Sequence, residues 1–280
     1  MKKLVIAGAG QMGMSVSELI NETNVQLIAF ADNDPAKLSN GHIPVVSFAD
    51  AVAMNPDIVL IGVLDNKRAS SMKMQFNTLG YSGEYILLSD IYNTYDMRGG
   101  AFRRFSPRLD NIPGAIAELG VYKGDFSLIL HRQFPDRTIY LFDTFEGFNA
   151  NDVEIETESS FSHSSTKDFA DTSAEYVLGR FGDTSNIVLK KGYFPDTAAG
   201  LENESFAFVS LDADLYVPTL AGLEFFYPRL SHGGAILLHD YGSMRFSGVF
   251  QAVSDYEKKH GELMLMPLCD LHKSCIILHP

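Results

Sequence analysis

The stretch Ala117-Glu-Leu-Gly-Val-Tyr-Lys-Gly124 decides the fold. It reads as a short apolar strand that ends in an acid and passes through two glycines into a helix. Glycines at such a turn allow a tight bend and a close backbone approach to a nucleotide, and the helix start supplies free amides. About 20 residues further on, the next expected strand ends in Asp143, where an acid can bind a ribose diol. The stretch therefore predicts a ligand-binding α/β sheet.

The sequence beyond this turn alternates strand-like and helix-like runs, which predicts an open α/β sheet over residues 91–280. We expect helices at 122–134, 218–230 and 246–260. Pro218 in the first turn and Gly261 after the last one are ordinary start and stop signals. The last two expected strands form an antiparallel hairpin at the C-terminus. The expected strands are 116–119, 138–142, 187–189, 206–211, 235–238, 263–268 and 274–278.

Residues 1–90 repeat the alternation on a smaller scale and predict a small Rossmann-like domain. Its first strand runs into a G-x-G-x-x-G turn formed by Gly8, Gly10 and Gly13, and Asp32 ends the second strand. Nothing that follows resembles the second half of a dehydrogenase. Four interpretations stay open: a nicotinamide oxidoreductase module, a dock for a nucleotide-linked substrate, an assembly domain or a brace for the fold. Assembly or bracing is preferred.

Length and charge exclude several classes of protein. At 280 residues the chain is comfortable for two domains. A net charge of −13 argues against a nucleic-acid partner, because phosphate binding requires a concentrated basic face. The apolar run at the N-terminus is broken by glycines, which favours a strand over a signal peptide. No run approaches the roughly 18 apolar residues of a membrane span, so no membrane insertion is expected.

The cysteine content indicates a reducing compartment. Cys269 and Cys275 are the only two cysteines, too few for a disulfide framework, so a cytoplasmic location is the simplest expectation. His272 and His279 lie nearby, and the four residues could be read as a metal cluster. The hairpin pattern around them favours a structural role instead.

Ionisable residues at the ends of later strands separate the two domains. Asp212 and Asp214 follow one strand, and His239 and Asp240 follow the next. Ligands of open α/β sheets bind beyond these ends, so the four side chains are expected to meet. Clustered carboxylates repel one another unless a cation or proton intervenes. A divalent metal is therefore preferred over a role for Asp212 and Asp214 as helix caps. Oxygen ligands suit Mg, Ca or Mn, whereas imidazole favours Mn, Fe, Ni or Zn.

Two other polar stretches have no assigned chemistry. Residues 149–173 are too polar to pack and predict a mobile loop or lid over a site. A basic cluster could bind a phosphate or an acidic substrate, but a solvated helix face paired with Asp96 and Asp110 is preferred. The cluster consists of Arg98, Arg103, Arg104 and Arg108.

At these residues the chain resembles the macrocin O-methyltransferase family. Its members are metal-assisted enzymes that use S-adenosylmethionine to methylate sugar hydroxyls of natural products and related glycans. The resemblance runs from about residue 95 to residue 261 and implies the class I methyltransferase form of the Rossmann-like sheet. The blocks that carry it are Ala117-Glu-Leu-Gly-Val-Tyr-Lys-Gly124, Tyr140-Leu-Phe-Asp-Thr-Phe-Glu-Gly-Phe148, Lys191-Gly-Tyr-Phe-Pro-Asp-Thr197, Leu211-Asp-Ala-Asp-Leu-Tyr216 and Tyr227-Pro-Arg-Leu-Ser-His-Gly-Gly234.

The resemblance implies a role for each matching residue. For the cofactor S-adenosylmethionine, the methionine part would lie beside Glu118 and Gly120, and Asp143 would hold the ribose hydroxyls. Gly124 would let the helix start approach the cofactor, and Thr144 and Gly192 would lie near the adenosine.

The resemblance also implies a metal site that departs from the family pattern. Asp212 would ligate the ion together with His239 and Asp240, and Asp214 would be the general base, with His239 beside it at the catalytic centre. The family usually has Asp-Asp-Tyr where this chain has His239-Asp240-Tyr241. Magnesium and manganese are the expected ions, and the histidine leaves the choice open.

The expected function is O-methyl transfer to a sugar hydroxyl of a glycan, a sugar nucleotide or a glycosylated natural product, as in polysaccharide biosynthesis. A homo-oligomer is possible on this interpretation. Two alternatives stay open: an NAD(P)-binding oxidoreductase module in residues 1–90, and a degenerate transferase that serves as a binding or scaffold subunit.

Overall fold

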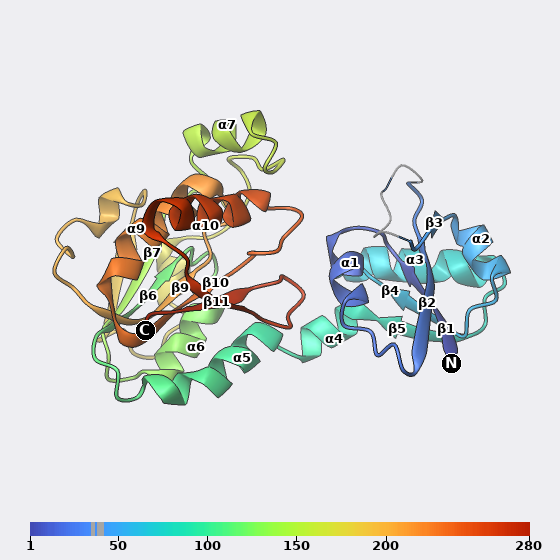
Figure 1. Cartoon of the computed structure of the whole chain (residues 1–280), viewed down its shortest axis with the longest axis horizontal. Coiled ribbons are helices and arrows are strands. Elements are labelled where there is room, and N and C mark those ends of the chain that lie inside the picture. The colour runs from blue at the N-terminus through green and yellow to red at the C-terminus, as the bar shows by residue number, and fades with distance from the viewer. Residues whose placement is uncertain (35–36, 38–41) are drawn as a thin grey trace. The chain divides into compact units, whose positions relative to one another are not determined.

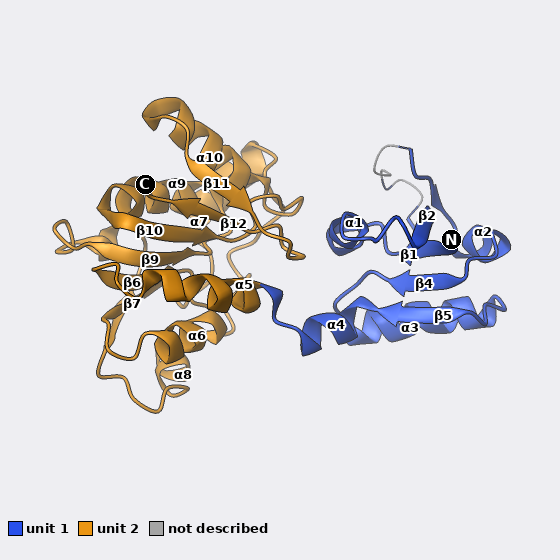
Figure 2. Ribbon diagram, turned by 60° about the horizontal axis from the view of Figure 1, so that its bottom comes forward, with its two compact units in different colours: residues 1–97 blue, residues 98–280 orange. Residues whose placement is uncertain are grey.

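The computed structural model of the protein describes residues 1–34, 37 and 42–280. It has two compact units, unit 1 over Met1–Met97 and unit 2 over Arg98–Pro280 (Figure 2). The chain passes from one to the other at the start of α5 (Met97–Phe105), a little beyond residue 90 of the sequence-based division. Both units are α/β, as the sequence predicts. No helix in the described part of the chain is long and apolar enough to span a membrane.

Unit 1 is built on a five-stranded parallel sheet in the order β3-β2-β1-β4-β5. Central strands are apolar because helices cover a parallel sheet on both faces, and all four residues of β4 are buried. The strands are β1 (Lys2–Ala7), β2 (Val25–Ala31), β3 (Val45–Val46), β4 (Ile58–Ile61) and β5 (Glu84–Leu87). The helices are α1 (Gln11–Ser17), α2 (Phe48–Ala53), α3 (Asn66–Thr78) and α4 (Leu88–Thr94).

Unit 2 is built on a seven-stranded sheet in the order β11-β12-β10-β9-β6-β7-β8. Its first five strands in the chain are parallel, and β12 pairs antiparallel with both β10 and β11, which confirms the predicted hairpin. The strands are β6 (Ala115–Leu119), β7 (Ile139–Asp143), β8 (Ile187–Lys191), β9 (Phe206–Leu211), β10 (Leu230–Leu238), β11 (Met264–Pro267) and β12 (Cys275–Leu278).

Helices cover both faces of the sheet in unit 2. Helices α9 (Tyr216–Phe226) and α10 (Ser247–His260) pack on one face, and α5 and α6 (Asp125–Gln133) pack on the other (Figure 1). Buried phenylalanines fill both interfaces. Phe226 packs against Phe142, Phe194 and Phe206 on the first face, and Phe102 packs against Phe208 on the second. Rings of this size bury much apolar area, so the packed layers hold the strand ends in fixed positions.

Two predicted helices have different ends in the structure, for identifiable reasons. Helix α6 begins at Asp125 rather than at residue 122, because Gly124 adopts a left-handed φ of 77° that no α-helix contains. Helix α9 ends at Phe226 and continues as a short 3₁₀ turn, Tyr227–Arg229. Pro228 lies in that turn, where its missing N–H ends the α-helical hydrogen bonding.

The expected mobile loop over residues 149–173 contains a packed helix, so that prediction is wrong in part. Helix α7 (Ala150–Glu158) turns two acids inward, and α8 (Ala174–Leu178) follows the stretch. The Tyr193 hydroxyl donates to Asp152 at 2.9 Å, and the Tyr216 amide donates to Glu156 at 2.7 Å. Polar residues can pack once such partners are present, and a local sequence does not show partners 40 to 60 residues away.

Candidate active site

The glycine turn after β6 lies at the point where the strand order of unit 2 reverses. From β6 the chain winds outward through β7 and β8, then returns to place β9 and β10 on the other side. Ligands of open sheets bind at such a crevice, here between β6 and β9. Gly120 has φ 88°, and a Cβ there would lie 1.9 Å from the Asp212 carbonyl oxygen. Only glycine therefore lets the turn run directly against the end of β9.

Asp143, at the end of β7, orders the glycine turn. Its Oδ2 accepts from the amides of Val121 at 2.7 Å and Tyr122 at 2.8 Å, and its Oδ1 accepts from the amide of Phe145 at 2.7 Å. An ionised carboxylate offers about four acceptor positions. These three amides leave capacity for a further donor, such as a ribose hydroxyl, so the residue fits the diol role.

The other residues predicted to bind the cofactor gather around the same strand ends. The Gly192 amide donates to the Asp143 carbonyl at 2.9 Å, and the Thr144 hydroxyl donates to the Gly147 carbonyl at 2.7 Å. Gly124 immediately precedes α6. The positions thus form one rim around the ends of β6, β7 and β8.

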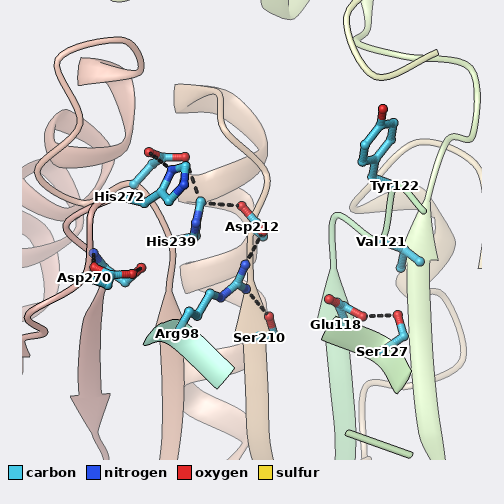
Figure 3. Close-up of polar contacts among 12 residues, drawn as sticks. Arg98, Glu118, Val121, Tyr122, Ser127, Ser210, Asp212, His239, Asp270 and His272 are labelled. Atoms are coloured by element: carbon cyan, nitrogen blue, oxygen red, sulfur yellow. Dashed lines mark hydrogen bonds and ion pairs between the residues drawn. The ribbon is translucent and has the colours of Figure 1, made fainter. Parts of the chain in front are cut away.

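Glu118 lies beneath this rim and is 2% exposed. Its carboxyl group accepts a hydrogen bond from the Ser127 hydroxyl on α6 (Figure 3). Burial raises the pKa of Glu118 to about 8, although Ser127 and Arg98 oppose the rise. Glu118 therefore holds the turn against α6 from behind, in a largely protonated state near neutral pH.

The ionisable residues after β9 and β10 meet, as their positions predict. One ligand atom from each of Asp212, Asp214, His239 and Asp240 lies within 4.8 Å of the others. The His239 Nδ1 is 2.9 Å from Asp212 Oδ1 and 2.8 Å from Asp240 Oδ2. The His239 amide also donates to the Leu211 carbonyl at 2.9 Å, which ties the two strand ends together.

Backbone conformations at the cluster are strained. Asp214 has φ 59° and Asp240 has φ 55°, both in the left-handed region that favours glycine. Such residues cost of order 1–3 kcal/mol each and concentrate at functional sites, where surrounding structure holds them. Both turns direct a carboxylate toward the crevice at that energetic cost.

Arg98 belongs to this cluster, which overturns its assignment to a solvated helix face. Its Nη1 is 2.6 Å from Asp212 Oδ2, and its Nη2 is 2.8 Å from the Ser210 hydroxyl (Figure 3). Its guanidinium lies 4.3 Å from the centre of the Phe126 ring. The pairing joins residues 98 and 212, and no local pattern shows such a contact. The other three arginines of the basic cluster are exposed, as expected for a helix face.

The carboxylates of the cluster require positive charge. Burial would raise the pKa of Asp212, but His239 and Arg98 outweigh it and hold that pKa below its usual value. The pKa of Asp214 lies well above its usual value because of burial and the nearby Asp212 and Asp240. Burial would lower the pKa of His239, yet Asp212 raises it to about 10. Asp214 and His239 therefore bind protons more readily than usual when no other cation is present.

The arrangement fits a divalent cation. Ligand atoms at neighbouring corners of an ion with bonds of about 2.1 Å would be roughly 3 Å apart, close to the two distances at His239 Nδ1. The His239 Nδ1 is buried and makes no hydrogen bond with either carboxylate oxygen. The Asp240 Oδ1 is also buried without a hydrogen bond among the described residues. With three carboxylates and one guanidinium at the site, a divalent cation would balance the two remaining negative charges.

His272 is a neighbour that the sequence interpretation grouped with the cysteines instead. It comes from the turn between β11 and β12, and its ring centre is 4.7 Å from that of His239 (Figure 3). Its Nδ1 lies 3.8 Å from Asp240 Oδ1. The two cysteines of that group are free thiols. The hairpin fold, rather than any spacing in the sequence, brings His272 here.

Comparison with known proteins agrees with this fold. The fold is that of the Rossmann-like methyltransferases: the solved O-methyltransferase NovP superposes with a TM-score of 0.53 at 23% identity, over 65% of this chain and 79% of that one. The family model described as Macrocin-O-methyltransferase (TylF) matches residues 106–278. The chain belongs to the macrocin O-methyltransferase family. A second model, described as PglD N-terminal domain, matches residues 3–68 within unit 1.

Two curated relatives match over part of their length. The 8-demethyl-8-(2,3-dimethoxy-alpha-L-rhamnosyl)-tetracenomycin-C 4'-O-methyltransferase of Streptomyces olivaceus is 30% identical over 162 residues, covering 54% of this chain and 61% of the relative. The Mycinamicin III 3''-O-methyltransferase of Micromonospora griseorubida is 29% identical over 164 residues, covering 54% and 63%. The chain thus spans about three-fifths of the length of these relatives.

Proposed function

We propose that unit 2 transfers a methyl group from S-adenosylmethionine to a sugar hydroxyl with the help of a divalent metal. The observation that carries the proposal is the direct contact between the glycine turn and the acid cluster. The Asp212 amide donates to the Leu119 carbonyl at 2.8 Å, and Gly120 lies against Asp212. A donor bound on the turn would therefore lie beside the groups that can activate an acceptor.

The cofactor would be held by the rim around β6, β7 and β8. Asp143 is the proposed partner of the ribose hydroxyls, since it keeps acceptor capacity after binding the turn amides. Gly120 and Gly124 give the backbone its close approach, while Thr144 and Gly192 flank the adenosine position. A large part of the rate would come from holding the sulfonium methyl in line with the acceptor oxygen.

The acid cluster would prepare the acceptor. A sugar hydroxyl is a weak nucleophile near neutral pH, and a bound divalent cation would supply Lewis acidity that lowers its pKa. Asp212, His239 and Asp240 are the residues proposed to hold that ion. Asp214 would accept the hydroxyl proton, because its raised pKa brings a carboxylate closer to the range in which a general base works best. Arg98 would fix the orientation of Asp212.

The acceptor class follows from the relatives together with the site. Both relatives are named as O-methyltransferases, and the name of the first includes a rhamnosyl group on its substrate. We extend to this chain O-methylation of a sugar hydroxyl, carried by a glycan, a sugar nucleotide or a glycosylated small molecule. Turnover with any such acceptor would dismiss the scaffold alternative.

Calorimetry with S-adenosylmethionine tests the cofactor assignment. Asp143→Ala is expected to weaken binding about tenfold to 100-fold, because hydrogen bonds to a charged group contribute about 1.5–3 kcal/mol. Asp32→Ala is the matched control, since Asp32 also accepts from its turn, at Ala9, and is expected to leave the affinity unchanged. Undiminished affinity in Asp143→Ala would discard the assignment. Titration with NADH on the same proteins tests the oxidoreductase alternative for unit 1.

A further inference from the structure

We propose that His272 is an additional ligand of the ion held by His239 and Asp240, so that the site takes a transition metal such as manganese, iron, cobalt, nickel or zinc in preference to magnesium. The inference rests on the proposed metal-assisted function and names the class of ion that the function uses. It adds a residue from the C-terminal hairpin to a site otherwise built from β9 and β10.

His272 lies beside His239 and Asp240, the two residues that belong to both candidate metal-binding sets. One ligand atom from each of His239, Asp240 and His272 lies within 4.8 Å of the others, as in the set formed with Asp212 and Asp214. Asp240 is 3% exposed, and its Oδ1, at 3.8 Å from His272 Nδ1, is too far away for a hydrogen bond. A buried carboxylate oxygen without a hydrogen bond facing an imidazole nitrogen marks a place where a cation satisfies both.

The hairpin turn holds His272 in this position. Asp270 is buried and accepts from both the amide and the hydroxyl of Ser274, each at 2.7 Å. The Gly242 amide donates to the Lys273 carbonyl at 3.1 Å, which joins the turn to the loop that follows Asp240. The turn is therefore braced on both sides of His272, and the imidazole would reach the ion with little loss of conformational freedom.

Donor chemistry then determines the class of ion. Mg²⁺ favours oxygen ligands and retains water, whereas imidazole suits the first-row transition metals and zinc. One histidine leaves the preference open, because three carboxylates accompany it. A second imidazole makes nitrogen a major part of the donor set and shifts the preference away from magnesium.

Pulsed electron paramagnetic resonance of the Mn²⁺-loaded full-length protein counts the coordinated imidazole nitrogens directly. Two are expected in the wild type, and one in His272→Ala. His279→Ala is the matched control, because His279 follows the same hairpin without joining the cluster, and two nitrogens are expected there. Calorimetry should show at least about a tenfold loss of Co²⁺ affinity in His272→Ala, because even the loss of a residue that only hydrogen-bonds to a metal ligand weakens metal binding by about that factor. The Mg²⁺ affinity should stay unchanged.

The outcomes separate this inference from the function beneath it. A single nitrogen in the wild type, or two in His272→Ala, would overturn the role of His272 and leave metal-assisted transfer standing. A wild type that binds neither Mn²⁺, Co²⁺ nor Mg²⁺ would overturn both the ligand and the metal assistance. In that case the binding of S-adenosylmethionine would still decide the cofactor assignment.

Discussion

The two units contain the same kind of turn, and among the described residues only the turn of unit 2 leads to ionisable groups that converge. In unit 1 the Ala9 amide donates to Asp32 Oδ2 at 2.8 Å, and in unit 2 the Val121 amide donates to Asp143 Oδ2 at 2.7 Å. Each turn follows an interior strand of its sheet, β1 in unit 1 and β6 in unit 2, and each acid lies at the end of the neighbouring strand. A glycine turn with its acid thus determines where a ligand can lie without determining any chemistry.

The difference comes from the strand on the other side of the crevice. In unit 1 that strand is β4, which is followed by Gly62 and then by Asp65, whose carboxylate caps α3 by accepting from the Arg68 amide at 2.7 Å. A Cβ on Gly62 would lie 3.0 Å from the Gly13 Cα, so the end of this strand also runs close to its glycine turn. In unit 2 the corresponding strand leads to Asp212 and Asp214. Among the residues that the structure describes, both clusters able to hold a metal lie in unit 2.

The acids of the two turns also differ in their surroundings. Asp32 pairs with Lys37 at 2.7 Å, whereas Asp143 accepts only backbone amides in the contacts described above. A ribose hydroxyl at Asp32 would have to share the carboxylate with the Lys37 ammonium, whereas at Asp143 it would share it with neutral amides. We propose on this basis that unit 1 braces or assembles the protein.

The largest expected effect comes from replacing an acid with its amide after the strand that lies across from each glycine turn. Asp214→Asn is expected to lower kcat by about 10² to 10⁴, the usual contribution of a general base, in an assay of labelled methyl transfer. Asp65→Asn is the matched change in unit 1 and should leave kcat unaltered, because asparagine also caps helices well. Equal rates for Asp214→Asn and the wild type would show that Asp214 is not the general base and that the acids of unit 2 do not set it apart from unit 1.

Adding a methyl group within each turn is expected to have an intermediate effect. A Cβ on Gly120 would meet the Asp212 carbonyl oxygen, and one on Gly13 would meet the Gly8 carbonyl oxygen, both at 1.9 Å. Gly120→Ala and Gly13→Ala should each lower the free energy of unfolding by about 1–3 kcal/mol, which urea titration measures. Only Gly120→Ala should reduce methyl transfer per folded molecule, since only that turn supports the acid cluster. Equal transfer by both variants would show that the turn of unit 2 does not position Asp212.

The last expected effect concerns the pH dependence of stability and leaves methyl transfer aside. Burial raises the pKa of Glu118 from 4.5 to about 8, so the folded state binds more protons than the unfolded state between these values. This contribution to stability is present at pH 4.5 and is lost as the pH rises toward 8. The free energy of unfolding of Glu118→Gln, measured by urea titration, should therefore fall less between pH 5 and pH 8 than that of the wild type.

The turn of unit 1 provides the control for this pH measurement. Burial would raise the pKa of Asp32, but Lys37 and backbone amides outweigh it and lower that pKa below its usual 3.8. Its contribution is present above pH 3.8 and disappears as the pH falls through the folded-state value. Asp32→Asn should accordingly keep the wild-type slope between pH 5 and pH 8. The same slope in Glu118→Gln and the wild type would contradict a buried, protonated Glu118.

Parts of the fold and of the site could be predicted from local pattern. Strand β9 occupies the predicted residues 206–211, because six consecutive buried residues give an unbroken apolar run. The convergence of Asp212, Asp214, His239 and Asp240 also followed from sequence, since parallel strands bring their carboxyl ends to one edge. Helix α7 could not be predicted, because its buried acids depend on partners from distant residues.

The sequence by itself determined the alternation of strands and helices, the two glycine turns and the acids at the strand ends, since each depends on neighbours along the chain. Only the tertiary structure decided that Arg98 holds Asp212 and that His272 faces Asp240. Those contacts join segments separated by many residues, and their formation depends on how the helices and the hairpin pack against the sheet. Side-chain burial and pairing are properties of that packing, which no local pattern encodes.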